Sequence, residues 1–358
     1  MPVTSGLQIS ARLFLAVLCG ATGGLIFNLL HLPLPWMLGA ITASTIAALA
    51  RMPVGTPRWV RPPLSAVIGT LLGAGFPSDV LLRASDWILP LAGLAVFMLT
   101  AGAACVWYFH RVCGYDFKTA YFCGMPGGLI EMTLLGEAKG ADPQRIALIH
   151  SARILLVVFI VSGVIQLFFV EGQLGSGGPD DEVFRISDLS WQTAIWMTGT
   201  CVAGVALGHY LKLPAAFLLG PMLVSATLHI SDLSDFEIPR ELVIAAQVGL
   251  GTTIGCRFFG QTFRQVGKTL VLCLGSTVIL LSMTVFFAWI LHLLTGINVL
   301  LLVLAYSPGG LAEMGLVALA LNFDTALVAC HHLVRVVLVG ITAGYIFRWF
   351  DRDDGSGA

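Results

Sequence analysis

The sequence predicts an all-α polytopic membrane protein built from two inverted-topology repeats. Each repeat is expected to hold about five transmembrane helices and one broken or re-entrant Pro-Gly-Gly hairpin. Three observations support this fold class. The chain is 57% hydrophobic and only 11% charged, whereas a soluble domain is about one quarter charged. Its second half repeats motifs of its first half at a nearly constant offset. Equivalent loops of the two halves carry opposite charge biases.

The composition also excludes some classes of function. A net charge of -1 over 358 residues provides no basic surface for nucleic acid. The eight cysteines lie in or beside apolar runs, and none has the Cys-x-x-Cys spacing typical of metal or redox sites. We therefore interpret them as small apolar side chains, and we expect no cofactor, no metal and no direct contact with nucleic acid.

A repeated heptapeptide defines the duplication. Pro-Gly-Gly-Leu-Ile-Glu-Met at 126–132 returns as Pro-Gly-Gly-Leu-Ala-Glu-Met at 308–314, an offset of 182 positions. Downstream residues follow at the same offset, namely Asp142, His150 and Arg153, which match Asp324, His332 and Arg335. The predicted organisation is membrane repeat 1 at 1–172, an external acidic and Gly-rich connector at 173–188, membrane repeat 2 at 189–350, and a polar tail at 351–358.

Ten apolar runs are long enough to be candidate helices across roughly 30 Å of hydrocarbon. In the first repeat they lie near 11–30, 33–50, 60–76, 87–109 and 145–170. In the second repeat they lie near 189–211, 214–230, 240–258, 268–293 and 325–348. One more segment precedes the last run of each repeat, at 115–140 and 297–322, and Pro-Gly-Gly interrupts it at its centre.

Loop charge decides whether these interrupted segments cross the membrane, because Lys and Arg in short loops favour the cytoplasm. After the second run, repeat 1 has three arginines where repeat 2 has only Arg240. After the third run, repeat 1 has only Arg83 where repeat 2 has three cations. Inverted repeats place both cation-rich loops in the cytoplasm, together with both termini. Inversion needs an odd number of crossings, so each interrupted segment is predicted to enter and leave on one side.

The Pro-Gly-Gly tips are the candidate site, because non-helical backbone at membrane depth must be buried in protein or line a water-filled cavity. Acidic residues within a membrane are costly and are functional candidates. His and Arg three positions apart share one face of the following helix. The candidate residues for binding a solute or ion are Pro126, Gly127, Gly128, Glu131, His150, Arg153, Pro308, Gly309, Gly310, Glu313, His332 and Arg335.

Two interpretations of these residues remain open. In the functional one, the glutamates bind a coupling proton or cation, and the arginines bind an anionic solute group through fork-like hydrogen bonds. The free amides of the tip glycines are further candidates for anion binding. In the structural one, Glu131 with Arg153 and Glu313 with Arg335 form buried pairs that fix each hairpin against the next helix. Pairing would keep the glutamates ionised, which makes histidine the better titrating group.

The duplicated Pro-Gly-Gly-Leu-x-Glu-Met and the downstream His-x-x-Arg resemble the AbrB-duplication family of bacterial inner-membrane proteins, over essentially the whole chain. Members of this family are labelled both as ammonia monooxygenase and as AbrB-type regulator. The resemblance implies the inner membrane of a Gram-negative cell and a link to regulation of gene expression. A monooxygenase needs a copper or iron site built from several ligands, and one deep histidine per repeat, with His331 beside His332, does not provide it.

The expected function is that of a secondary transporter or permease that moves a small solute by alternating access around the two tips. An anionic solute would suit the arginines. The alternative is a membrane-embedded regulator that senses a ligand at the same tips and acts indirectly on gene expression. We expect no enzymatic activity. The expected partners are the lipid bilayer, a small solute with its coupling proton or cation, and further copies of the chain in a homo-oligomer.

Overall fold

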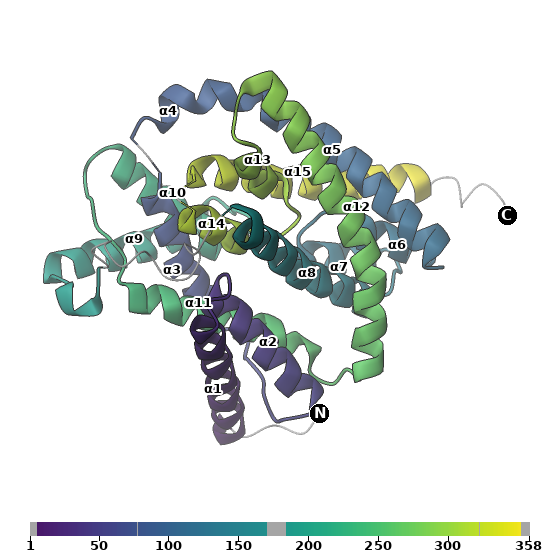
Figure 1. Cartoon of the computed structure of the whole chain (residues 1–358), viewed down its shortest axis with the longest axis horizontal. Helices are drawn as coiled ribbons and strands as arrows, with labels where there is room; N and C mark the ends of the chain where they lie inside the picture. Colours follow the sequence, from purple (N-terminus) through teal and green to yellow (C-terminus); the bar gives the residue numbers. More distant parts are fainter. Residues whose placement is uncertain (1–5, 77, 170–183, 322, 352–358) are drawn as a thin grey trace. The chain divides into compact units, whose positions relative to one another are not determined.

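The computed structural model describes residues 6–76, 78–169, 184–321 and 323–351. Every regular element in these ranges is a helix, as Figure 1 shows, which confirms the predicted all-α class for this part of the chain. Residues 173–183 of the predicted connector and residues 352–358 of the predicted tail lie outside the described residues.

Each of the ten predicted runs contains a helix. The first five are α1 (Gly6–Leu29), α2 (Pro35–Leu49), α3 (Arg61–Ala74), α5 (Ile88–Trp107) and α8 (Pro143–Phe169). The other five are α9 (Trp191–Tyr210), α10 (Ala216–Ile230), α11 (Arg240–Gly255), α12 (Phe263–Thr295) and α15 (Thr325–Asp351). Proline in the first turn helps to start α2 and α3, because its missing N–H needs no partner there.

The interrupted segments are helix pairs, as their central Pro-Gly-Gly predicts. In the first repeat α6 (Phe117–Gly124) is followed by α7 (Leu129–Ala138), and in the second α13 (Val299–Tyr306) is followed by α14 (Leu311–Ala320). Each helix has only 8 or 10 residues, which corresponds to about 12–15 Å at 1.5 Å per residue. None of the four is long enough to cross a bilayer alone.

Five short elements were not predicted from the sequence. They are α4 (Val80–Arg83), the 3-10 helix η1 (Ala84–Trp87), the π-helix η2 (Tyr108–Val112), and the 3-10 helices η3 (Ile186–Asp188) and η4 (Cys256–Phe258). Each is 3 to 5 residues long, and the apolar periodicity of a sequence does not resolve elements of that length.

Four helical stretches in the described residues are long and apolar enough to cross a membrane. They are Ile9–Leu29, Ala84–Val112, Pro143–Leu167 and Phe263–Thr295. The helices α2, α3, α10 and α11 have only 14 to 16 residues, fewer than the roughly 20 that a perpendicular crossing needs. Ten complete crossings therefore stay a prediction. Large apolar side chains such as Phe14 on α1 and Trp289 on α12 are more than half exposed, as expected of surfaces that face lipid.

The described chain forms two compact units, and each unit combines segments of both repeats. Unit 1 consists of residues 1–82, 158–266 and 312–326, and unit 2 consists of residues 83–157, 267–311 and 327–358. The units therefore do not follow the boundary between the two repeats.

Unit 1 is built on reciprocal packing of equivalent helices. Helix α1 packs on α2 as α9 packs on α10, while α3 packs on α10 as α11 packs on α2. Glycines make these contacts close: a Cβ on Gly69 would lie 2.2 Å from the carbonyl oxygen of Leu218, and a Cβ on Gly251 would lie 2.6 Å from that of Met37. This agrees with the small-residue packing that membrane helices use. The two repeats therefore make equivalent contacts with each other.

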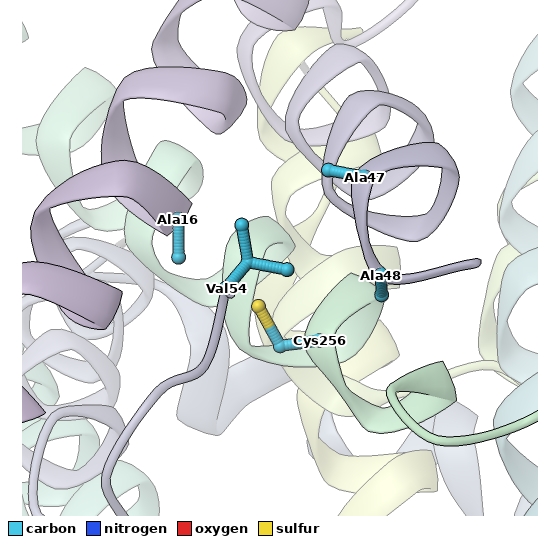
Figure 2. Close-up of a cluster of buried hydrophobic side chains, with 5 residues drawn as sticks. All are labelled: Ala16, Ala47, Ala48, Val54 and Cys256. Atoms are coloured by element: carbon cyan, nitrogen blue, oxygen red, sulfur yellow. The ribbon is translucent and has the colours of Figure 1, made fainter. Parts of the chain in front are cut away.

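Unit 1 also contains a small apolar cluster. Ala16 of α1, Ala47 and Ala48 of α2, Val54 of the following loop and Cys256 of η4 are all buried together (Figure 2). The side chains are small, so the α1–α2 pair and η4 approach closely. The burial of Cys256 in this cluster agrees with the prediction that the cysteines act as small apolar side chains.

Candidate functional site: the two Pro-Gly-Gly tips

Both Pro-Gly-Gly tips and both His-x-x-Arg pairs belong to unit 2. The first tip follows α6, whose last carbonyl groups have no partner within the helix. His150 and Arg153, one turn apart on α8, supply donors to them. His150 Nε2 lies 2.8 Å from the carbonyl oxygen of Phe122. The Arg153 guanidinium donates to the carbonyl oxygens of Cys123, Met125 and Gly127 at 3.3 to 3.5 Å.

The second tip repeats this arrangement with the residues 182 positions later. His332 Nε2 lies 3.1 Å from the carbonyl oxygen of Leu304. Arg335 donates to the carbonyl oxygens of Ser307 at 2.5 Å and Gly309 at 2.7 Å. We call these two arrangements the tip clamps. In each, the positive guanidinium lies against the carbonyl end of a short helix, where the helix dipole favours a cation.

Each clamp fixes the protonation state of its histidine. The Arg153 guanidinium and His150 Nδ1 are 2.9 Å apart, and so are those of Arg335 and His332. Arginine can only donate, so Nδ1 is the acceptor. A carbonyl oxygen can only accept, so Nε2 carries the proton. Both histidines are therefore neutral, with both ring nitrogens in use. All four side chains are at most 6% exposed.

The Glu131–Arg153 pair that the sequence suggested is not among the contacts of the described residues, because backbone carbonyl oxygens and His150 occupy Arg153. Glu131 is exposed, and its carboxylate folds back over the N-terminus of α7. A Cβ on Gly128 would lie 2.0 Å from Glu131 Oε2. Gly128 is the N-cap residue of α7 and Glu131 its third residue, a position at which a carboxylate is stabilised by the free amides.

The second glutamate has different surroundings. Glu313 is 6% exposed and belongs to unit 1, whereas Arg335 belongs to unit 2. Within unit 1, the charge of Glu313 interacts favourably with that of Arg257 in η4. Arg257 is one of the three cations that follow the third run of repeat 2, and its relation to Glu313 was not predicted. Nothing in the spacing of the two residues indicates it.

Two further residues of unit 2 support the first tip. A Cβ on Gly102 of α5 would lie 3.0 Å from the Met125 sulfur, and a Cβ on Gly127 would lie 2.7 Å from a methyl group of Val339 on α15. The tip of repeat 1 therefore packs against a helix of repeat 2. Gly102 and Val339 have no chemistry that a sequence pattern would select, so neither was predicted.

The first helix of each hairpin has a side-chain cap at its N-terminus, Asp116 for α6 and Asn298 for α13. Asp116 accepts a hydrogen bond from the Thr119 N–H at 2.9 Å, and Asn298 accepts one from the Leu300 N–H at 2.8 Å. Burial raises the pKa of the Asp116 carboxyl, but the hydrogen bonds from Thr119 and the charge of Arg145 outweigh it and leave the pKa below its ordinary value.

The helices after each hairpin begin with an aspartate cap. Asp142 accepts from the N–H groups of Gln144 and Arg145 at 3.0 and 3.1 Å. Asp324 accepts from the Ala326 N–H at 3.0 Å. These bonds satisfy the first amides of α8 and α15, and Asp142 also forms an ion pair with Arg145 at 3.0 Å.

The fold and the site define an all-helical, membrane-type protein with two repeats and two clamped Pro-Gly-Gly tips. The chain belongs to the AbrB family: the family model described as "Transition state regulatory protein AbrB" matches residues 36–351. This confirms the family that the repeated motifs resemble.

Two curated relatives extend over nearly the whole chain. "Uncharacterized protein YhjN" of Bacillus subtilis (strain 168) is 26% identical over 357 residues, covering 91% of this chain and 89% of the relative. "Putative regulator AbrB" of Escherichia coli (strain K12) is 26% identical over 324 residues, covering 90% of this chain and 92% of the relative.

Proposed function

We propose that this protein is a secondary transporter of a small solute, with the two Pro-Gly-Gly tips as its binding site. The observation that carries the proposal is the pair of equivalent tip clamps in unit 2. An interruption of a helix within the membrane leaves carbonyl groups without hydrogen-bond partners, and lipid cannot supply them. Such an interruption is therefore tolerated only in a protein interior or beside water. Two buried arginines that hold two such breaks are difficult to explain by stability alone, because buried charges are costly.

Broken helices in inverted repeats are the usual plan of secondary transporters. The reversed loop charges support inversion, and the reciprocal contacts of α2, α3, α10 and α11 fit two repeats related by an approximate two-fold axis. In this proposal the hairpins are re-entrant, one from each side of the bacterial inner membrane. Both termini are cytoplasmic, and the connector at 173–188 is external.

The clamps favour a division of roles within the site. The guanidinium forks of Arg153 and Arg335 bind tip carbonyl oxygens, so we assign the arginines to positioning rather than to a solute anion. Glu131 and Glu313 then carry the negative charge that a coupling proton or cation needs. The Glu131 carboxylate lies over the N-terminus of α7, so we assign the first-turn amides of α14 to an anionic group of the solute. No metal and no chemical reaction are assigned to the site.

The second candidate function is a membrane-embedded regulator that binds a ligand at the same tips. The description of the family model and the name of the Escherichia coli relative favour it. In that case a ligand would bind without crossing the membrane, and a partner would transmit the signal. The two candidates share one site and differ in whether solute moves.

Solute uptake and efflux by the purified protein in liposomes tests the proposal. We expect Glu131→Gln and Glu313→Gln to abolish or uncouple movement. Glu137→Gln is the matched control, because Glu137 is exposed on the same helix as Glu131, nearly two turns further on, and should transport normally. Binding of a ligand without any solute movement, together with a change in a partner protein, would replace the transporter by the regulator.

Topology is tested separately with reporter tags. Tags at both termini should report the cytoplasm, and a tag near Gly177 should report the outside. An external terminus would refute the inverted arrangement.

A further inference from the structure

A third deep histidine lies outside the tip clamps. His331 of α15 is 0% exposed, and its ring centroid is 5.8 Å from that of Tyr306 on α13. Its Nδ1 lies 2.8 Å from the carbonyl oxygen of Leu327, one turn earlier. Because that oxygen can only accept, Nδ1 carries the proton. Nε2 then carries an unprotonated lone pair, and it has no hydrogen-bond partner in the described part of the chain.

This lone pair distinguishes His331 from the clamp histidines. Protonation of His150 or His332 at Nδ1 would break the hydrogen bond from its arginine and place a second cation 2.9 Å from the guanidinium nitrogen. Protonation of His331 at Nε2 breaks no hydrogen bond. Leaving a buried acceptor unpaired costs about 1–3 kcal/mol, so a donor that arrives at Nε2 is favoured.

The titratable and charged groups near His331 do not change the conclusion that it is easier to protonate than the clamp histidines. On α15 they are His332 beside it and Arg335 one turn further on. On α13 the nearby titratable group is Tyr306, whose hydroxyl donates to the Pro90 carbonyl oxygen. Helices α5 and α13 contain no Asp, Glu, Lys or Arg. Within unit 2, α12 contributes only Lys268 near its start and His292 in its last turn.

The two repeats differ at this place. At the offset of 182, His331 corresponds to Ile149 and Tyr306 corresponds to Gly124, whereas the clamp residues are the same in both repeats. The chain therefore carries one His–Tyr ring contact in repeat 2 where repeat 1 has an aliphatic side chain and a glycine. A packing requirement common to both repeats does not explain the difference.

We propose that His331 Nε2 is the proton-binding site of unit 2, the first of the three deep histidines to be protonated as the pH falls. In the transporter it is a proton-binding group in addition to Glu131 and Glu313. This role deepens the proposed function and rests on it, but the order of protonation does not.

The test is ¹⁵N NMR of histidine-labelled protein in lipid bilayers, titrated from about pH 8 down to about pH 3, because burial favours the neutral imidazole. Eight histidines contribute signals, and His331→Ile, His150→Gln and His332→Gln assign the three deep ones. Ile is the residue that repeat 1 has at the equivalent position, so His331→Ile should fold. We expect the Nδ1–H tautomer for His331 and the Nε2–H tautomer for His150 and His332. His331 should bind a proton at least about tenfold more tightly than the other two, because no hydrogen bond is lost.

If one of these variants fails to fold, its signal is assigned by elimination from single variants of the other seven histidines, so one such failure does not block the test. An Nε2–H tautomer at His331, or earlier protonation of His150 or His332, overturns the inference and leaves the transport proposal standing. The expected order together with no solute movement in liposomes overturns the proposed function and leaves the proton site.

Discussion

Removing the two clamp arginines should destabilise the two tips to different extents. Arg335 holds its carbonyl oxygens at 2.5 and 2.7 Å, whereas Arg153 holds its three at 3.3 to 3.5 Å. A hydrogen bond from a charged group contributes about 1.5–3 kcal/mol, and removing a buried cation recovers part of that through lower desolvation cost. We expect Arg335→Met to cost about 3 kcal/mol.

Arg153→Met should cost less. Its contacts to the carbonyl oxygens are near the outer limit of hydrogen bonding, so we expect a loss of about 1 kcal/mol. Methionine approximates the length of the arginine side chain without its donors, which limits the cavity contribution. The difference of about 2 kcal/mol between the variants is the quantity to be measured.

Hydrogen exchange at the tips measures it locally. The Ser307 N–H bonds the Val303 carbonyl at 2.9 Å, and the Met125 N–H bonds the Tyr121 carbonyl at 3.1 Å. In Arg335→Met the Ser307 amide should exchange about a hundredfold faster than in the wild type, while in Arg153→Met the Met125 amide should exchange less than tenfold faster. Equal acceleration, or a larger effect at Met125, would refute the view that these arginines act through tip carbonyl groups.

Three further predictions follow from single contacts. Gly69→Ala should lower thermal stability in detergent by about 1–3 kcal/mol through overpacking, whereas Gly199→Ala, which meets nothing within 4 Å, should raise it by about 0.5–1 kcal/mol; the opposite ranking would contradict the helix contacts in unit 1. Gly128→Ala should reproduce the transport defect of Glu131→Gln, because its Cβ displaces the Glu131 carboxylate, and adding Glu131→Gln should cause no further loss. Because the pKa of Asp116 is lowered, its carboxylate stabilises the fold above the unfolded-state pKa, and this stabilisation is lost as pH falls through the folded-state pKa. Asp116→Asn introduces the residue found at the equivalent position in repeat 2, and thermal melts of this variant should lack the acid-dependent loss. A pH profile equal to that of the wild type would contradict this role of Asp116.

Much of the helical organisation could be predicted from the sequence. Apolar runs located all ten long helices, and the Pro-Gly-Gly breaks located the ends of α6, α7, α13 and α14. These features depend on local properties: hydrophobicity, the missing proline N–H and the N-terminal caps. The short elements η2 and η4 have only 5 and 3 residues, too few for apolar periodicity to predict them.

The partners of the site residues were harder to predict. The spacing of His150 and Arg153 placed them on one helix face, and one of the two interpretations of the sequence paired Arg153 with Glu131. A sequence pattern shows which side chains can pair. Every residue has a carbonyl group, so a sequence pattern does not predict which carbonyl oxygen a side chain binds. The offset of 182 gave equivalent positions but not the assignment of Glu131 and Glu313 to different units, which depends on contacts between distant segments.

The tip clamps hold main-chain atoms, and this has a consequence for how the two repeats have diverged. The residues whose carbonyl groups are held differ between the repeats: Phe122 against Leu304 and Met125 against Ser307. The hydrogen bonds from histidine and arginine persist all the same. The clamp therefore needs the same histidine and arginine in each repeat but not the same side chains at Phe122 and Met125, so the two halves of the chain can differ at these positions and keep a common backbone geometry.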